Sequence, residues 1–192
     1  MLRASEERNQ VLATRHIDFC NQTYYNPVRF TPIAVNIETK IAGEGYESAQ
    51  SQMAVWVFAQ FAKLRRMFGQ VPPFLPLLLV QGDEWSFLAA SQSPTVGFDD
   101  KRDYDTYIWD KVAIGSTSSL AGVWKVCAVL QYLANWAVTD YAVWLSARLG
   151  LQTPNPRPAA AVGTKVRNFH SPYPSFVVKV YHHCFARSTA SL

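Results

Sequence analysis

Glu38 and Lys40 stand two residues apart in a run of alternating side chains, residues 32–41. In a β-strand this spacing places a carboxylate and an ammonium side by side on one face. A second alternating run, residues 14–20, carries Asp18, which can supply another carboxylate from a neighbouring strand. Mg²⁺ and Mn²⁺ prefer oxygen ligands, so Asp18 and Glu38 are candidate metal ligands. Lys40 would then position a water molecule or stabilise negative charge developing on a phosphoryl group.

Taken alone, a Glu-x-Lys pair is more often an exposed pair on the surface of a strand than a catalytic site. The elements around it therefore matter. Gly43 and Gly45 end the strand, and from Tyr46 the apolar residues follow helical spacing. The members of this helical stripe are Met53, Val57, Phe61, Leu64 and Phe68.

The rest of the chain predicts a hairpin, another strand and a long helix. Residues 77–80 and 85–90 form the expected hairpin around residues 81–84, and residues 106–111 form the further strand. The serines and threonine of residues 116–119 offer N-cap hydroxyls to an apolar helix, which Gly150 is placed to end. We expect one domain over residues 1–150.

Residues 151–192 are predicted to be a proline-rich linker followed by a basic, peripheral tail. Pro154, Pro156 and Pro158 cannot sustain a helix, and one strand-like run, residues 176–181, follows. All 14 acidic residues lie in residues 1–150 with 13 of the 18 basic ones, so the net charge of +4 comes from the tail. The domain is near neutral, and only a local basic cleft could bind phosphate.

Two groups of side chains could contact nucleic acid, but both have simpler interpretations. Lys63, Arg65 and Arg66 could touch phosphate, although basic residues in the last turn of a helix already complement its dipole. The six tryptophans could stack on bases, yet each lies in an apolar segment where core packing explains it. They are Trp56, Trp85, Trp109, Trp124, Trp136 and Trp144.

Several motifs in order resemble the fungal branch of the PD-(D/E)XK nuclease-like family. The resemblance spans roughly residues 14–150 and is carried by six stretches of sequence: residues 16–19, 32–40, 49–56, 73–76, 81–85 and 114–117. It implies an α/β, restriction-endonuclease-like fold: a mixed central sheet flanked by helices, with one helix after the Glu-x-Lys strand and a long apolar helix closing the domain.

By this resemblance Asp18, Glu38 and Lys40 take the family's catalytic positions, with Asp18 and Glu38 as the metal ligands. Gln52 matches a helix glutamine near the site, and a hydrogen-bonding role at the helix N-terminus is an equal alternative. Ile17 replaces the proline of the general motif. The family core begins with a helix and a strand before the Asp-bearing strand, and 17 residues are too few for both. We therefore expect an N-terminally short domain, either truncated or without that part.

The resemblance implies Mg²⁺- or Mn²⁺-dependent phosphodiester hydrolysis of nucleic acid. Two alternatives stay open. The fold could be redeployed for a small-molecule cyclisation or isomerisation in fungal secondary metabolism, which a neutral domain rich in Trp and Tyr would suit. It could instead be a non-catalytic binding module. An open groove beside Glu38 would favour nucleic acid, and a closed apolar pocket would favour a small molecule.

Cysteine usage and hydropathy indicate the compartment. Cys20, Cys127 and Cys184 are too few and scattered for a disulfide framework, which favours an intracellular protein, cytoplasmic or nuclear. No apolar h-region of a secretory signal is evident near the N-terminus. The most apolar stretch, residues 120–149, contains Lys125, Asp140 and Arg148, so we expect no membrane association.

Overall fold

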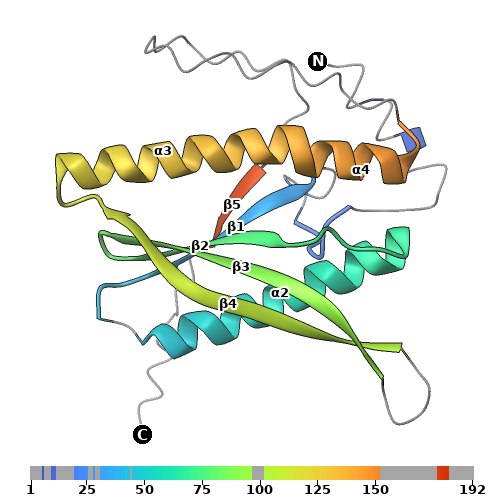
Figure 1. The fold of residues 1–192 in the computed structure, drawn as a ribbon, viewed down its shortest axis with the longest axis horizontal. Helices are drawn as coiled ribbons and strands as arrows, with labels where there is room; N and C mark the ends of the chain where they lie inside the picture. The colour runs from blue at the N-terminus through green and yellow to red at the C-terminus, as the bar shows by residue number, and fades with distance from the viewer. Residues whose placement is uncertain are drawn as a thin grey trace, which may run out of the picture.

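The computed structural model describes residues 6, 10–11, 20–25, 28, 31–43, 45–96, 102–151 and 177–181. Its centre is a five-stranded mixed sheet in the order β4-β3-β2-β1-β5. Helix α2 covers one face of this sheet, and α3 with α4 covers the other (Figure 1). The predicted class, α/β with a mixed central sheet and flanking helices, is confirmed.

Strand β1 (Ile33–Lys40) is the predicted Glu-x-Lys strand, and β2 (Leu75–Gln81) lies parallel to it. Both strands are buried along most of their length because helices cover both faces, as is usual for parallel strands. Asn36 pairs with Leu77 and Lys40 with Gln81, so the two strands end at the same edge of the sheet.

Helix α2 (Tyr46–Phe68) connects these strands and buries the predicted apolar stripe against the sheet. The helix ends at Gly69, whose φ of 70° lies in the left-handed region that favours glycine, and whose N–H bonds to the carbonyl of Arg65. Arg65 and Arg66 lie in the last turn, where their charges complement the helix dipole.

Strands β3 (Glu84–Val96) and β4 (Arg102–Ser116) form a second hairpin, and each strand is longer than the sequence predicts. Beyond the predicted bounds β4 gains residues 112–116 at one end, and at the other end of the hairpin the extra residues, 91–96 and 102–105, are mostly polar. They pair with each other, Ser93 with Asp105 and Val96 with Arg102, at the edge of the sheet. At this end of the hairpin, backbone pairing rather than an apolar pattern therefore accounts for the extra length.

The closing helix is one continuous rod with a wider turn inside it. Helix α3 (Leu120–Trp136) runs through the π-helical turn η2 (Ala137–Tyr141) into α4 (Ala142–Leu149). The Ser119 hydroxyl accepts the Gly122 N–H as the predicted N-cap, and Gly150, with φ of 71°, ends the rod. Among the described helices, none has the length and hydropathy needed to cross a membrane.

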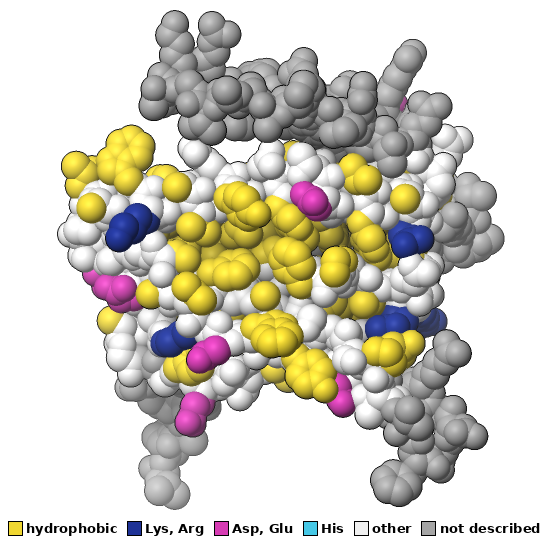
Figure 2. Space-filling model, in the orientation of Figure 1, with side chains coloured by type: hydrophobic (Ala, Val, Ile, Leu, Met, Phe, Trp, Pro, Cys, Tyr) yellow, Lys and Arg dark blue, Asp and Glu magenta, His cyan; other side chains and the backbone are white. Residues whose placement is uncertain are grey.

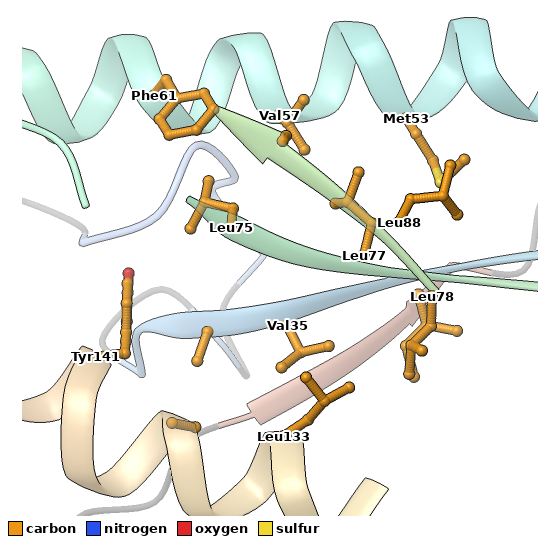
Figure 3. Packing of buried hydrophobic residues seen from close by; sticks show 14 of the residues in the cluster. Val35, Met53, Val57, Phe61, Leu75, Leu77, Leu78, Leu88, Leu133 and Tyr141 are labelled. Carbon is orange, nitrogen blue, oxygen red and sulfur yellow. The ribbon is translucent and has the colours of Figure 1, made fainter. Parts of the chain in front are cut away.

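The core lies in two layers, one on each face of the sheet (Figure 3). Met53, Val57 and Phe61 of α2 pack on Leu77 and Leu88, all nearly fully buried. On the other face Val35 and Leu78 pack toward Leu133 of α3, and Tyr141 is buried beside β1.

The prediction that all six tryptophans pack in the core is wrong for two of them. Trp109 on β4 and Trp124 on α3 retain 61% and 67% of their exposure. Their segments are apolar, but only one side of each segment reaches the core of this chain. Trp136 and Trp144, in contrast, stack against Tyr141 with ring centroids 5.7 and 5.9 Å away.

Five residues of the predicted tail belong to the sheet. Strand β5 (Val177–Tyr181) lies parallel to β1, with Val180 paired to Ile37 and Tyr181 to Glu38. These five residues pair with β1, and the division of the chain at residue 150 stays a prediction. The strand predicted over residues 14–20 lies outside the described residues except for Cys20, which is buried.

Candidate active site

Glu38 and Lys40 point from β1 toward α2, and each is almost completely covered. The Lys40 Nζ and Glu38 Oε1 atoms are 3.4 Å apart, and the two side chains retain 7% and 6% of their exposure. The predicted same-face pair is thus an ion pair inside the protein. Removing two charges from water costs several kcal/mol per ion, so such a pair needs further polar partners.

Gln52 supplies one such partner from the second turn of α2. The Lys40 ammonium donates a hydrogen bond to Gln52 Oε1 at 2.6 Å. The structure therefore brings Glu38, Lys40 and Gln52 together, and the side chain of Gln52 contacts the site. Its acceptor oxygen orients the ammonium, which has three donors on a flexible stem.

The Glu38 carboxylate has an unfilled acceptor. Its Oε1 atom is buried, and no hydrogen bond reaches it from the described residues. Buried polar atoms normally have a hydrogen-bond partner, and an exception calls for a water, an ion or a functional role. A carboxylate oxygen of this kind is the donor that a hard divalent cation prefers.

The second predicted carboxylate, Asp18, lies outside the described residues. Within the described part of the chain no three His, Cys, Asp or Glu residues gather as a metal cluster. At Glu38 both hydrogen-bonding edges of β1 are taken, one by Leu79 of β2 and the other by Tyr181 of β5. A further carboxylate must therefore approach Glu38 over the α2-facing side of the sheet.

A buried polar ladder continues from the site along α2, and sequence reasoning missed it. Asn36 donates to Gln60 Oε1 at 2.8 Å and accepts from Trp56 Nε1 at 3.1 Å. Gln60 in turn donates to the carbonyl of Ile33 at 2.9 Å. The available signal was that Gln52, Trp56 and Gln60 repeat every four residues, as Asn36, Glu38 and Lys40 repeat every two.

The ladder ends at Tyr141 of the π-helical turn. Burial raises the pKa of this phenol above its ordinary value, the nearby Cys20 raises it further, and a hydrogen bond with Gln60 partly opposes both effects. Tyr141 thus stays neutral near β1. The ladder fixes the register of α2 against β1, which sets Gln52 opposite Lys40.

Two of the sequence motifs meet beside the site. The Gly82 N–H donates to the carbonyl of Lys40 at 2.9 Å, so the β2–β3 turn closes the end of β1. Gly82 has a φ of 63°, and a Cβ atom there would lie 2.8 Å from that of Ala42. On the other side of this turn, Asp83 accepts hydrogen bonds from the Thr117 N–H at 2.8 Å and the Ser116 hydroxyl at 3.0 Å.

Arg65 has a structural partner rather than an open charge. Its guanidinium lies 3.2 Å from the centre of the Tyr104 ring and donates to Gln92 Oε1 at 2.6 Å. These contacts tie the end of α2 to the β3–β4 hairpin. They agree with a structural interpretation of this arginine.

Comparison with known proteins identifies the family. A family model described as the PD-(D/E)XK nuclease superfamily matches residues 2–142, about three quarters of the chain. No curated protein and no solved structure matches the chain. The mixed sheet with flanking helices is consistent with the restriction-endonuclease-like fold. The matched region contains Glu38, Lys40, Gln52 and the polar ladder, and the chain therefore belongs to the PD-(D/E)XK nuclease superfamily.

Proposed function

We propose that this protein is a Mg²⁺- or Mn²⁺-dependent phosphodiesterase that hydrolyses nucleic acid. The observation that carries the proposal is the buried Glu38 Oε1 atom, which accepts no hydrogen bond from the described residues and lies 3.4 Å from an ammonium that Gln52 holds. This oxygen pairs with the ammonium by charge alone and can still accept a further ligand. Membership of a nuclease superfamily supports the same chemistry.

The residues fit a divalent cation in part. Glu38 would hold the ion through its carboxylate, and Asp18 is the second ligand that the family resemblance implies. Mg²⁺ keeps several waters and often takes only one or two protein carboxylates together with substrate phosphates, so two carboxylates suffice. When bound, the ion supplies a polarised phosphoryl oxygen and a water of lowered pKa.

The described side chains have separable roles in this proposal. Glu38 holds the cation, and its negative charge also offsets the positive charge of the adjacent Lys40 ammonium. Lys40 presents positive charge where negative charge develops on the phosphoryl oxygens in the transition state. Gln52 keeps the ammonium in place, so that little reorganisation is needed during the reaction.

A small-molecule reaction at this site has less support. An apolar cavity lined by residues such as Phe87 and Leu133 lies on the α3-facing side of the sheet. Glu38 and Lys40 face α2, so the sheet separates the cavity from the site. The six sequence motifs support placing the chain in the fungal branch of the superfamily, and this is part of the proposal. A small-molecule reaction in secondary metabolism is the alternative.

Metal titration and cleavage assays with Glu38→Gln test the proposal. The substitution keeps the shape of the side chain while removing its charge. Wild-type protein should be stabilised by about 2–3 kcal/mol at a Mn²⁺ concentration a hundred times the Kd. In Glu38→Gln this thermal shift should disappear, and the cleavage rate should fall at least about a hundredfold.

Glu47→Gln is the matched control, because Glu47 is exposed in the first turn of the same helix that carries Gln52. It should behave as wild type. If neither Mn²⁺ nor Mg²⁺ shifts the melting temperature of wild-type protein, and single-stranded, duplex and branched substrates all survive, the proposal is wrong.

A further inference from the structure

The face of the molecule opposite the site exposes a large amount of apolar surface. The described residues expose eleven large apolar side chains, and six of them lie on β4 and α3. These six are Tyr107, Trp109, Val112, Leu120, Trp124 and Tyr132, between 48% and 75% exposed. Figure 2, in the orientation of Figure 1, shows apolar side chains gathered in the band between α3 and β4. This surface is named the α3 face below.

The part on β4 is continuous with the apolar cavity. The cavity, about 280 Å³, is lined by Phe74, Phe87, Val112, Ile114, Val129, Tyr132, Leu133 and Trp136. Phe87 pairs with Val112, Ala89 with Trp109 and Ser91 with Tyr107. Since alternate residues of β3 share a face, Trp109 and Tyr107 extend the cavity wall along the hairpin.

The amount of exposed surface fits a protein interface. Six large side chains exposed to this extent present on the order of 600 Å². The largest apolar patch of a typical monomer is about 300–600 Å². One side of a standard protein–protein interface covers about 800 Å². The α3 face therefore has nearly the area that a stable dimer requires before any polar rim is counted.

Helix α3 has the composition of a helix buried on all sides. Lys125 is the only charged residue among its 17, yet within this chain the helix buries only Gly122, Val126 and Leu133. A helix that is apolar all round is normally covered all round. The remaining side of α3 therefore calls for a partner surface. Because α3 carries so little charge, two copies of it would not repel each other strongly.

The exposed side of α3 is also complementary to itself. Ala121, Ala128 and Asn135 are exposed and repeat every seven residues, so they form one line that lets a second helix approach closely. Trp124 and Tyr132 are exposed at equal distances before and after Ala128. A two-fold axis at Ala128 would thus bring each Trp124 to the other copy's Tyr132, which lines the cavity.

We propose that the α3 face is a two-fold interface with a second copy of this chain. The α3 helices pack antiparallel across Ala128, and the partner's Trp124 enters the cavity beside Tyr132. A cavity of about 150 Å³ accommodates benzene, so 280 Å³ suffices for an indole ring. Two-fold dimers are the commonest oligomers, and their interfaces use the same patch on both copies. The interface lies on the side of the sheet opposite Glu38 and Lys40.

Sedimentation of the full chain across a concentration series tests this. Wild-type protein should dimerise, and Ala128→Lys should weaken the dimer at least about a hundredfold, because it brings two like charges to the axis. Lysine is a good helix former, so the variant should keep the wild-type melting behaviour of the monomer. Ala147→Lys, at an exposed alanine of α4, should leave the dimer intact.

Cross-linking tests the orientation in a chain whose Cys127 and Cys184 are replaced by serine. Ala128→Cys should cross-link efficiently with a short bismaleimide. Ala121→Cys should not, because an antiparallel pair separates the two positions by about 20 Å. A wild-type monomer at all concentrations, or a dimer that survives both Ala128→Lys and Trp124→Lys, would overturn the interface. Cross-linking through Ala121→Cys alone would overturn the antiparallel arrangement.

Discussion

At the scale of single residues, burial changes what the Glu38–Lys40 pair means. An exposed ion pair contributes roughly 0–1 kcal/mol to the stability of the fold. The Glu-x-Lys spacing alone therefore says little about function. At 6–7% exposure, the loss of one partner leaves a buried charge and costs roughly 3–5 kcal/mol. The site therefore depends on the carboxylate, the ammonium and the Gln52 amide together.

Gln52→Leu should separate positioning from metal binding. The substitution removes the Gln52 oxygen that accepts a hydrogen bond from Lys40 at 2.6 Å. The Glu38 carboxylate is left unchanged. We expect kcat to fall by about tenfold or more. The Mn²⁺ concentration that gives half of the thermal shift should stay within about twofold of the wild-type value. Gln52→Glu should recover part of kcat, because a carboxylate can still accept the hydrogen bond. An unchanged kcat in Gln52→Leu would show that the ammonium needs no positioning.

The spacing of residues predicted part of this site. Period-two alternation placed Glu38 beside Lys40, and the family motif added Gln52. The ladder through Asn36, Trp56 and Gln60 was not predictable, because a polar side chain on a buried face can be satisfied by many partners. Only the packing of α2 on β1 selects one. The position of Asp18 remains a prediction.

At the scale of elements, close backbone contacts explain features that periodicity does not. Gly122 opens α3 directly against the end of β4, and a Cβ atom there would lie 2.0 Å from the Ser116 carbonyl oxygen. The sequence correctly predicted that a hydroxyl of residues 116–119 caps this helix, a role that Ser119 takes, and that Gly150 ends it. It did not predict the π-helical turn, since residues 137–141 continue the apolar pattern of the helix around them.

Gly122→Ala should therefore destabilise the protein by roughly 3 kcal/mol, because neither the strand nor the helix start can move without losing other contacts. Chemical denaturation measures the change. Gly45→Ala is the control: a Cβ atom there meets nothing within 4 Å, so the cost should be about 1 kcal/mol or less. Equal effects for the two variants would mean that the β4–α3 junction adjusts freely.

At the scale of the whole molecule, the sheet divides two different surfaces. The α2 side holds the charged site, and the α3 side holds the apolar face. Composition predicted one core but not this division, because it depends on which side of each apolar segment is covered. The sheet order was also beyond the sequence: nothing in residues 176–181 indicates that they pair with β1 rather than form a separate strand.

The last prediction concerns this final strand. The elements up to Leu149 enclose a buried apolar core, and β5 pairs with β1 through the backbone. A chain ending at Leu151 should therefore still unfold cooperatively, with stability lower by roughly 1–3 kcal/mol from the lost hydrogen bonds. It should also aggregate more readily, because the edge of β1 becomes available for pairing. Deletion of residues 182–192 alone is the control and should change the melting temperature little. Loss of the cooperative transition in the Leu151 truncation would place the domain boundary beyond β5.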